Sequence, residues 1–307
     1  MNGGVPNGAR DGRQGVRARG GDAGAAPPLA DKRALRSRQD KQMTNLSSAN
    51  APLVGDAFGA ALLDQLAGLP GVVTYERDDG YVQVDSTNYI SDWNDRDSWA
   101  IARAAGRVLD VGAGAGRVCL RLAESGLDAV ALDVSAGAVE VCRRQGVQNV
   151  FHGTIDDLPS TELFDTFIVL GNNLGLIGSP EKAQGFFDAI ALRMRPGGRI
   201  VGGCLDPYQT DDPDHLAYHQ ANIAVGRMAG QVRLRTRYRR LASDWFDLLW
   251  MSMAELAALA RQSGWQITDS MPGPLYAVVL ERNWRGHSSG ATPRSSAGLG
   301  NHAPWPS

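Results

Sequence analysis

The first half of the chain contains the sequence Arg107-Val-Leu-Asp-Val-Gly-Ala-Gly-Ala-Gly116. Its apolar residues 108–111 predict a buried strand, and the run from Val118 to Ser125 predicts a helix. Three glycines at alternate positions separate these two elements. Glycine lacks Cβ, so the backbone of such a turn can approach a ligand closely. A strand, a glycine-rich turn and a helix N-terminus together indicate a nucleotide-binding site.

The spacing of these glycines distinguishes between two kinds of nucleotide. A dinucleotide-binding fingerprint, G-x-G-x-x-G/A, would place its third glycine at position 117, which is Arg117 in this chain. The third glycine is Gly116 instead. This G-x-G-x-G spacing after Val-Leu-Asp-Val resembles motif I of the class I S-adenosylmethionine-dependent methyltransferases.

Further segments follow in the order of that family, and the resemblance covers about residues 75–282. The run Ala129-Val-Ala-Leu-Asp133 predicts a second strand, and Ser135 caps the helix after it. Five more strands are predicted, with a Pro-Gly-Gly turn before the third of them: residues 149–153, 164–171, 200–204, 265–270 and 276–282. The resemblance implies an α/β fold: a doubly wound, seven-stranded, mostly parallel Rossmann-like sheet with an antiparallel last strand.

The resemblance also implies the cofactor, S-adenosyl-L-methionine, and the residues that contact it. A carboxylate at Asp133 can accept hydrogen bonds from both ribose hydroxyls. Many relatives carry Gly-Asp-Ala after the third strand, where this chain has Gly153-Thr154-Ile155, so Thr154 would have to accept the bond from the adenine amine. The expected cofactor-binding residues are Asp110, Gly112, Ala113, Gly114, Gly116, Asp133, Val134, Thr154, Ile155, Gly171, Asn172 and Tyr89.

Candidates for the catalytic residues lie just beyond the strands, where ligands of open α/β sheets bind. A general base is needed if the acceptor is a hydroxyl, whereas an amine needs none beyond solvent. His215 and His219 share one helix face at a metal-ligand spacing, but no glutamate stands between them as in zinc proteases, so no metal is expected. The predicted catalytic residues are His152, Asn172, Tyr208 and His215, each with a purely structural role as the alternative. Asp206 is an equally placed acceptor contact.

Composition divides the chain into a central domain and two tails. Residues 1–50 have no periodic apolar pattern and predict a disordered tail, as do residues 286–307. The first tail carries nine basic and four acidic residues, a net charge of +5, so the remaining chain carries −7 of the total −2. Met43 is a candidate for the true translation start. Residues 51–285 form the expected domain, with an N-terminal lid over residues 52–106 and a substrate-recognition insertion over residues 205–251.

The insertion contains a predicted helix followed by a strictly alternating strand. Asp211–Ala229 predicts the helix, and Gln231–Arg239 predicts a half-exposed strand with four arginines on one side. These arginines are expected to face solvent, with an acidic substrate group or a partner subunit as the alternative. The lid begins with a short amphipathic helix expected at Phe58–Leu69.

The bulk composition limits location and partners. No run of about 18 apolar residues appears, so no membrane-spanning helix and no membrane partner are expected. The three cysteines, Cys119, Cys142 and Cys204, are expected to be buried and unpaired, which fits a reducing cytoplasm. The small negative net charge makes nucleic acid an unfavoured partner, and a homodimer stays open.

The sequence therefore predicts an enzyme that methylates a nitrogen or oxygen of a small molecule or small peptide. The absence of an Asn-Pro-Pro-Tyr type motif favours a tailoring enzyme of specialised metabolism. Three alternatives stay open: a nucleic-acid methyltransferase, an NAD-dependent oxidoreductase, and a cofactor-binding module without activity. Arg117 argues against the oxidoreductase, because it replaces the third glycine of the fingerprint.

Overall fold

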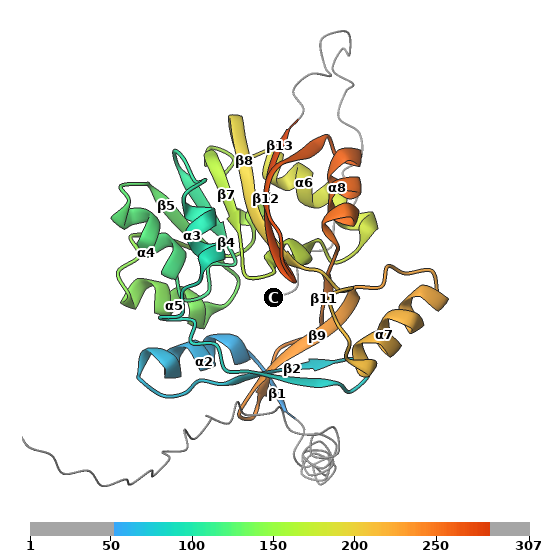
Figure 1. Ribbon diagram of the computed structural model, residues 1–307. Helices are drawn as coiled ribbons and strands as arrows, with labels where there is room; N and C mark the ends of the chain where they lie inside the picture. The colour runs from blue at the N-terminus through green and yellow to red at the C-terminus, as the bar shows by residue number, and fades with distance from the viewer. Residues whose placement is uncertain (1–51, 283–307) are drawn as a thin grey trace, which may run out of the picture. The chain divides into compact units, whose positions relative to one another are not determined.

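The computed structural model describes residues 52–282 and contains a seven-stranded sheet at its centre (Figure 1). The strand order is β12-β13-β8-β7-β4-β5-β6, and of these strands β13 alone runs antiparallel to its neighbours. This order and the antiparallel last strand confirm the predicted fold class. The strands are β4 (Val108–Val111), β5 (Ala129–Asp133), β6 (Asn149–His152), β7 (Phe164–Val169), β8 (Met194–Leu205), β12 (Trp265–Met271) and β13 (Leu275–Arg282). The two predicted tails lie outside the described residues.

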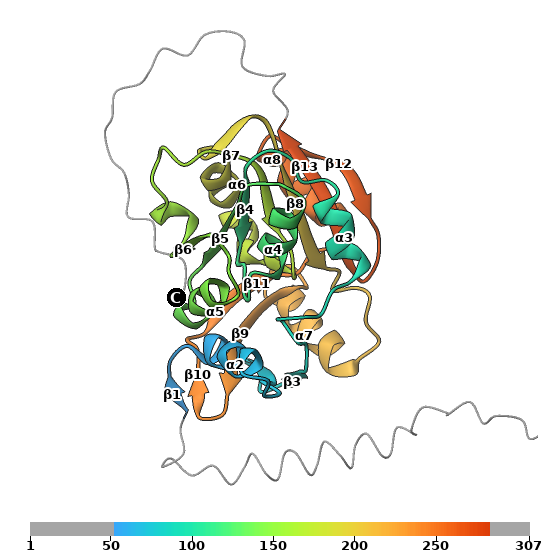
Figure 2. The same ribbon diagram turned by 90° about the vertical axis from the view of Figure 1, so that its left-hand side faces the viewer.

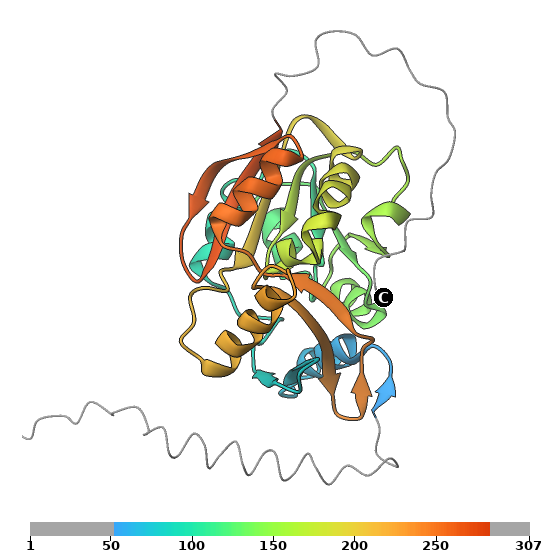
Figure 3. The ribbon, with the colours of Figure 1, turned by 90° about the vertical axis from the view of Figure 1, so that its right-hand side faces the viewer.

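Helices cover both faces of this sheet. Neighbouring residues of its strands point to opposite sides, and both sets of side chains are apolar and need to be buried. Val108, Ile168 and Val201 pack with α3 (Asp95–Ile101) and α4 (Arg117–Glu124), which lie on the face turned toward the viewer in Figure 2. Their sequence neighbours Leu109, Phe167 and Ile200 pack with α6 (Ala183–Ala191) and α8 (Met253–Gln262), seen in Figure 3. The remaining helical elements beside this sheet are α5 (Ala136–Arg144), η2 (Ile155–Asp157), η3 (Asn173–Ile177) and η4 (Pro180–Lys182).

A second sheet, which the sequence did not predict, joins the expected lid to the expected insertion. Its order is β1-β10-β9-β2-β3, and β11 also pairs with β9. β2 pairs antiparallel with β9, so Tyr75 lies opposite Thr236. The strands are β1 (Leu53–Val54), β2 (Val73–Arg77), β3 (Val82–Asp85), β9 (Gln231–Tyr238), β10 (Leu241–Ala242) and β11 (Phe246–Leu249). Two helices lie beside this sheet, α2 (Ala57–Leu66) and α7 (Pro213–Ala224).

Strand β9 confirms the predicted alternation but corrects the expectation for two of the four arginines. Its apolar side is buried, as expected. Arg233 and Arg239 are exposed, at 53% and 64%, as expected. Arg235 and Arg237 are only 22% and 19% exposed, and carboxylates of neighbouring elements pair with all four arginines. Arg235 and Arg237 both bond Glu76 of β2, at 2.8 and 3.0 Å. The other two pairs are Arg233 with Asp247 and Arg239 with Asp64. Their partners lie on segments that are distant in sequence, so the alternating pattern could not reveal them.

Helix α2 attaches the second sheet to the first through a shared helix cap. The Asp56 carboxylate accepts from Gly59 N at the start of α2, at 2.8 Å. It also accepts from the Ser135 hydroxyl and from Gly137 N at the start of α5, each at 2.8 Å. A single side chain therefore satisfies backbone donors that two helices leave unpaired at their N-termini.

Of the helices between Pro52 and Arg282, none combines the length and apolar character that crossing a bilayer requires. The three cysteines are buried and unpaired, as predicted.

Candidate functional site

The glycine turn between β4 and α4 has the backbone conformation that its glycines permit. Gly112, Gly114 and Gly116 have φ angles of +70°, +57° and +79°, where side chains are disfavoured. A Cβ at Gly116 would lie 2.8 Å from Val147, and one at Gly112 would lie 2.5 Å from the Asn173 amide. A Cβ at Gly114 would meet only the Phe58 ring, at 3.9 Å. The outer two glycines are thus required by packing, and the middle one presents backbone to the space beneath α2.

Asp133 ends β5 beside this turn and is only 8% exposed. Its carboxylate accepts from Gly114 N at 2.8 Å and from Ser135 N at 2.9 Å. A carboxylate offers about four acceptor positions, so acceptor capacity remains for a ligand. Burial raises the pKa of Asp133 to about 6, against the lowering effect of these two backbone bonds.

Asp110 lies in β4 and is 3% exposed. Burial raises its pKa to about 7, and the nearby Arg117 opposes this shift. The Cys119 thiol lies 3.7 Å from the carboxylate and is a weak donor. A buried carboxylate with so little hydrogen bonding is costly in its charged form, so a cationic ligand group would stabilise it.

Asp110→Asn is expected to stabilise the ligand-free protein above neutral pH. The pKa of Asp110 rises from 3.8 to about 7 on folding, so its ionisation weakens the folded state progressively between those values. Asparagine does not ionise, so the gain in the free energy of unfolding over the wild type should grow from pH 4 to pH 7 and then stay constant. Thermal denaturation should show a Tm at least about 2 °C higher at pH 8, with a smaller difference at pH 4.5. An equal loss of Tm at both pH values would contradict the raised pKa of Asp110.

Residues after β6 are placed by bonds within their own turn. The Thr154 hydroxyl donates to Asp157 at 2.7 Å and closes a capping box on η2. It keeps acceptor capacity, so its predicted adenine contact stays a prediction. Ile155 packs in the core beside α6. The exposed His152 ring contacts the Val134 carbonyl oxygen at 3.0 Å.

Two asparagines after β7 connect the ends of the central strands. The Asn172 side chain accepts from Leu205 N at 2.8 Å and so ties the end of β7 to the end of β8. Asn173 donates to the carbonyl oxygens of Val111 and Gly112, at 2.9 and 3.1 Å. Asn173 therefore holds the start of the glycine turn, a role that was not predicted for it. A Cβ at Gly171 would meet no atom within 4 Å, so this position borders open space.

Tyr89 lies over the glycine turn as part of a hydrogen-bonded group. Its hydroxyl donates to Asp85 at 2.6 Å and contacts the Tyr75 hydroxyl at 3.2 Å. Its ring meets Phe58 edge to face at 5.1 Å and packs near Ala115 of the turn. The structure thus brings the predicted Tyr89 together with the predicted glycine turn.

Two predicted catalytic residues have other partners. Tyr208 is 52% exposed and donates to Glu255 at 2.7 Å, and burial together with this bond raises its pKa to about 12. His215 contacts the Thr210 hydroxyl at 3.3 Å and packs against Tyr81. Within residues 52–282, no hydrogen bond joins either residue to Asp133 or the glycine turn. The same range contains no cluster of three or more potential metal-ligating side chains.

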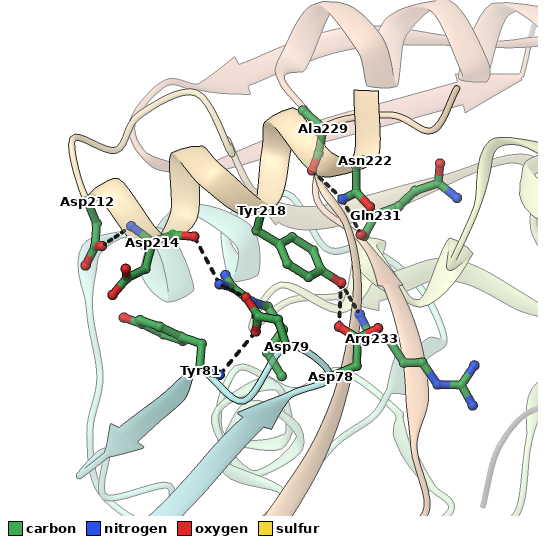
Figure 4. Close-up of polar contacts among 11 residues, drawn as sticks. Asp78, Asp79, Tyr81, Asp212, Asp214, Tyr218, Asn222, Ala229, Gln231 and Arg233 are labelled. Atoms are coloured by element: carbon green, nitrogen blue, oxygen red, sulfur yellow. Dashed lines mark hydrogen bonds and ion pairs between the residues drawn. The ribbon is translucent and has the colours of Figure 1, made fainter. Parts of the chain in front are cut away.

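An arginine that the sequence did not single out holds α7 on the second sheet. Arg77 is buried between the rings of Tyr81 and Tyr218, at 4.6 and 4.1 Å from their centroids. It bonds both carboxylate oxygens of Asp79 and the carbonyl of Asp214 at the start of α7. Figure 4 shows this group, in which Tyr218 also reaches Asp78 and Arg233. No local pattern marks this role of Arg77, because Asp214 and Tyr218 lie on or near α7, far away in the sequence.

Two further arginines lie near the central sheet. Arg117, at the position of the missing third glycine, forms an ion pair with Asp97, which is 2% exposed. Arg96 donates through Nε to the Leu275 carbonyl at 2.9 Å. Burial lowers the pKa of Arg96, and within residues 52–282 no carboxylate forms an ion pair with it. Its guanidinium can therefore bind an anionic ligand group.

Comparisons with known proteins agree with this geometry. Residues 108–198 match a protein family described as a methyltransferase domain. A SAM-dependent methyltransferase from Bacteroides fragilis, solved in complex with S-adenosyl-L-homocysteine, is 27% identical, with a TM-score of 0.64. The similarity covers 76% of this chain and 99% of that one. These similarities support the class I S-adenosylmethionine-dependent methyltransferases as the family that the sequence resembles.

The curated relatives of this chain match a shorter region. The uncharacterized methyltransferases Mb3374 of Mycobacterium bovis and Rv3342 of Mycobacterium tuberculosis are each 34% identical over 103 residues. The match covers 33% of this chain and 41% of each relative, so it spans less than half of their length.

The family cofactor is S-adenosylmethionine, and the residues present fit it. The open side of Gly114 permits a close approach, the carboxylate of Asp133 keeps free acceptor positions, and the space beside Gly171 is unfilled. The methyltransferase-domain match and the neighbour solved with S-adenosyl-L-homocysteine support the predicted cofactor, S-adenosyl-L-methionine. The contacts of individual residues with it stay predictions.

Proposed function

We propose that the protein transfers the methyl group of S-adenosylmethionine to a nitrogen or oxygen atom of a small molecule or small peptide. The observation that carries this proposal is the joining of the glycine turn to Asp133. The Gly114 N–H and the buried carboxylate bond each other beside the N-terminus of α4. Such a site offers a backbone that a nucleoside can approach and an acceptor for its sugar hydroxyls.

We assign the binding of the amino-acid end of the cofactor to protein side chains of opposite charge. Its ammonium group complements the buried Asp110, and its carboxylate complements Arg96, which lacks a carboxylate partner within residues 52–282. Phe58 and Tyr89 would cover the nucleoside end. When bound, the cofactor supplies a methyl group on a sulfonium leaving group, so the protein contributes mainly by positioning, worth roughly 7–11 kcal/mol in favourable cases.

The second sheet and α7 supply the acceptor side in this proposal. Residues 52–106 act as the lid and residues 205–251 as the recognition insertion, because strands from both segments pair in the second sheet. Asn172, at the ends of β7 and β8, is the best-placed of the four predicted catalytic residues. The pKa of Tyr208 is about 12, so its hydroxyl stays protonated near neutral pH and cannot serve as a general base. This favours acceptors that need no base.

The arginine face of β9 gives no support to a nucleic-acid substrate. A protein that binds phosphates needs cations that are free to neutralise them. Arg235 and Arg237 are already bonded to Glu76 within the same sheet. The assignment to specialised metabolism stays a prediction of the sequence.

The test combines binding with transfer. Calorimetry should show saturable binding of S-adenosylmethionine and S-adenosylhomocysteine and none of NAD+ or NADH. Methyl-labelled S-adenosylmethionine, incubated with the protein and an extract of its own organism, should label a small-molecule or small-peptide fraction. Binding of the nicotinamide nucleotides in place of the sulfonium would refute the proposal. Cofactor binding without label transfer would favour the non-catalytic module, and labelled RNA or DNA would favour the nucleic-acid alternative.

A further inference from the structure

A small pocket lies beyond the end of β8, next to the proposed acceptor side. Its volume is about 240 Å³, and Asp206, Met253, Tyr276 and the turn Pro272–Pro274 line it together with Gln209. Asp206 N donates to the Pro274 carbonyl at 2.7 Å and joins the two sides of the pocket. The preceding residue, Leu205, donates to Asn172, so the pocket begins one residue beyond the strand end that Asn172 holds.

The hydroxyl of Tyr276 is a buried polar group with no nitrogen or oxygen partner among the described residues. The side chain is 1% exposed and lines this pocket. The hydroxyl lies near the Cys204 thiol but forms no hydrogen bond of ordinary geometry within residues 52–282. The Cys204 sulfur itself contacts the carbonyl oxygens of Leu205 and Leu249. Leaving a buried hydroxyl unpaired is costly, and a ligand that bonds it recovers that cost.

The charges beside this pocket are negative. One carboxylate oxygen of Asp206 accepts from Tyr208 N at 3.0 Å, and no cation within residues 52–282 forms an ion pair with it. Glu255 lies close enough to act on the Tyr276 hydroxyl electrostatically, as does Asp206. The residues lining the pocket include no lysine or arginine. Arg96 lies against Gly203, on the opposite face of the sheet from Tyr276.

We propose that this pocket holds a protonated amino group of the acceptor, with the Asp206 carboxylate and the Tyr276 hydroxyl oxygen as its hydrogen-bond partners. The inference rests on the proposed function and narrows its substrate class to amine-bearing small molecules. An ammonium group has three donors and no acceptor, which matches two oxygen atoms in a site without cations. A protonated nitrogen has no lone pair, so the group held here anchors the acceptor and another atom receives the methyl group.

Three matched probes test the proposal: benzylamine, benzyl alcohol and benzoate, which differ mainly in the charge of one substituent. Each is titrated into the full chain by calorimetry, with and without saturating S-adenosylhomocysteine. We expect benzylamine to bind at least fivefold more tightly than benzyl alcohol, and benzoate to bind most weakly. Equal binding of the three probes, or preference for benzoate, would overturn the proposal. Binding of S-adenosylhomocysteine is recorded in the same experiment, so failure of the cofactor assignment is seen separately.

Variants then locate the binding. Asp206→Asn should reduce the preference for benzylamine to less than twofold, whereas Asp211→Asn, an exposed aspartate of the same loop, should leave it unchanged. Tyr276→Phe should weaken benzylamine binding at least threefold without lowering the Tm of the ligand-free protein, because the hydroxyl has only the weakly bonding Cys204 thiol beside it among the described residues. An unchanged preference in Asp206→Asn, or a lowered Tm with unchanged binding in Tyr276→Phe, would place the amine elsewhere.

Discussion

Asp133→Ala is expected to weaken the binding of S-adenosylmethionine at least tenfold. Hydrogen bonds to a charged acceptor contribute roughly 1.5–3 kcal/mol each, so the loss of even one bond to the ribose gives this factor. The substitution also removes the acceptor of Gly114 N and Ser135 N, at 2.8 and 2.9 Å, and so loosens the glycine turn. Titration calorimetry with S-adenosylhomocysteine gives the affinity without turnover.

Two variants separate the carboxylate from general damage to the fold. Asp133→Asn keeps one acceptor oxygen, and we expect its affinity to lie between those of the wild type and the alanine variant. Asp128→Ala removes an exposed aspartate just before the same strand, paired with Arg107, and should leave the affinity unchanged. An Asp133→Ala protein that binds the cofactor as tightly as the wild type would refute the role assigned to this carboxylate.

Gly137→Ala should lower the free energy of unfolding by about 1–3 kcal/mol, the usual cost of overpacking. A Cβ at Gly137 would lie 2.5 Å from the Cα of Gly59, where α5 meets α2. These atoms belong to backbone and cannot rotate away, so α2 has to shift. Phe58, which lies on α2, would then move away from the glycine turn, and we expect cofactor affinity to fall as well.

A glycine in another helix provides the matched control. Gly185 lies in α6, and a Cβ there would meet no atom within 4 Å. Gly185→Ala should be neutral or stabilising by up to about 1 kcal/mol, because alanine favours helix more than glycine does. Urea unfolding of both variants measures the difference. If the two variants were equally stable, the close crossing of α2 and α5 would not constrain position 137.

The central sheet was predictable because its signals are local. The glycine spacing, the strand that ends at Asp133 and the cap at Ser135 each lie within a few residues of the element they define. The capping box of Ser252 with Glu255 at the start of α8 is local in the same way. In each case the residue type and the backbone conformation depend on neighbours in the sequence.

The second sheet was not predictable for the opposite reason. Glu76 and Arg237 lie 161 residues apart, and the sequence around either residue does not indicate that they pair. The alternating arginines predicted the strand β9, but they did not indicate which carboxylates pair with them. Arg77, Arg96 and the unpaired Tyr276 hydroxyl were missed for the same reason, since their significance depends on which side chains surround them.

The pairing of β2 with β9 has a consequence for engineering. A graft that replaced residues 205–251 alone, in order to exchange substrate preference with a relative, would bring a foreign β9 against the native β2. Glu76 would lose Arg235 and Arg237 and become a half-buried carboxylate without a counterion. A functional chimaera therefore has to transplant residues 52–106 together with residues 205–251, so that two stretches far apart in the gene behave as one exchangeable module.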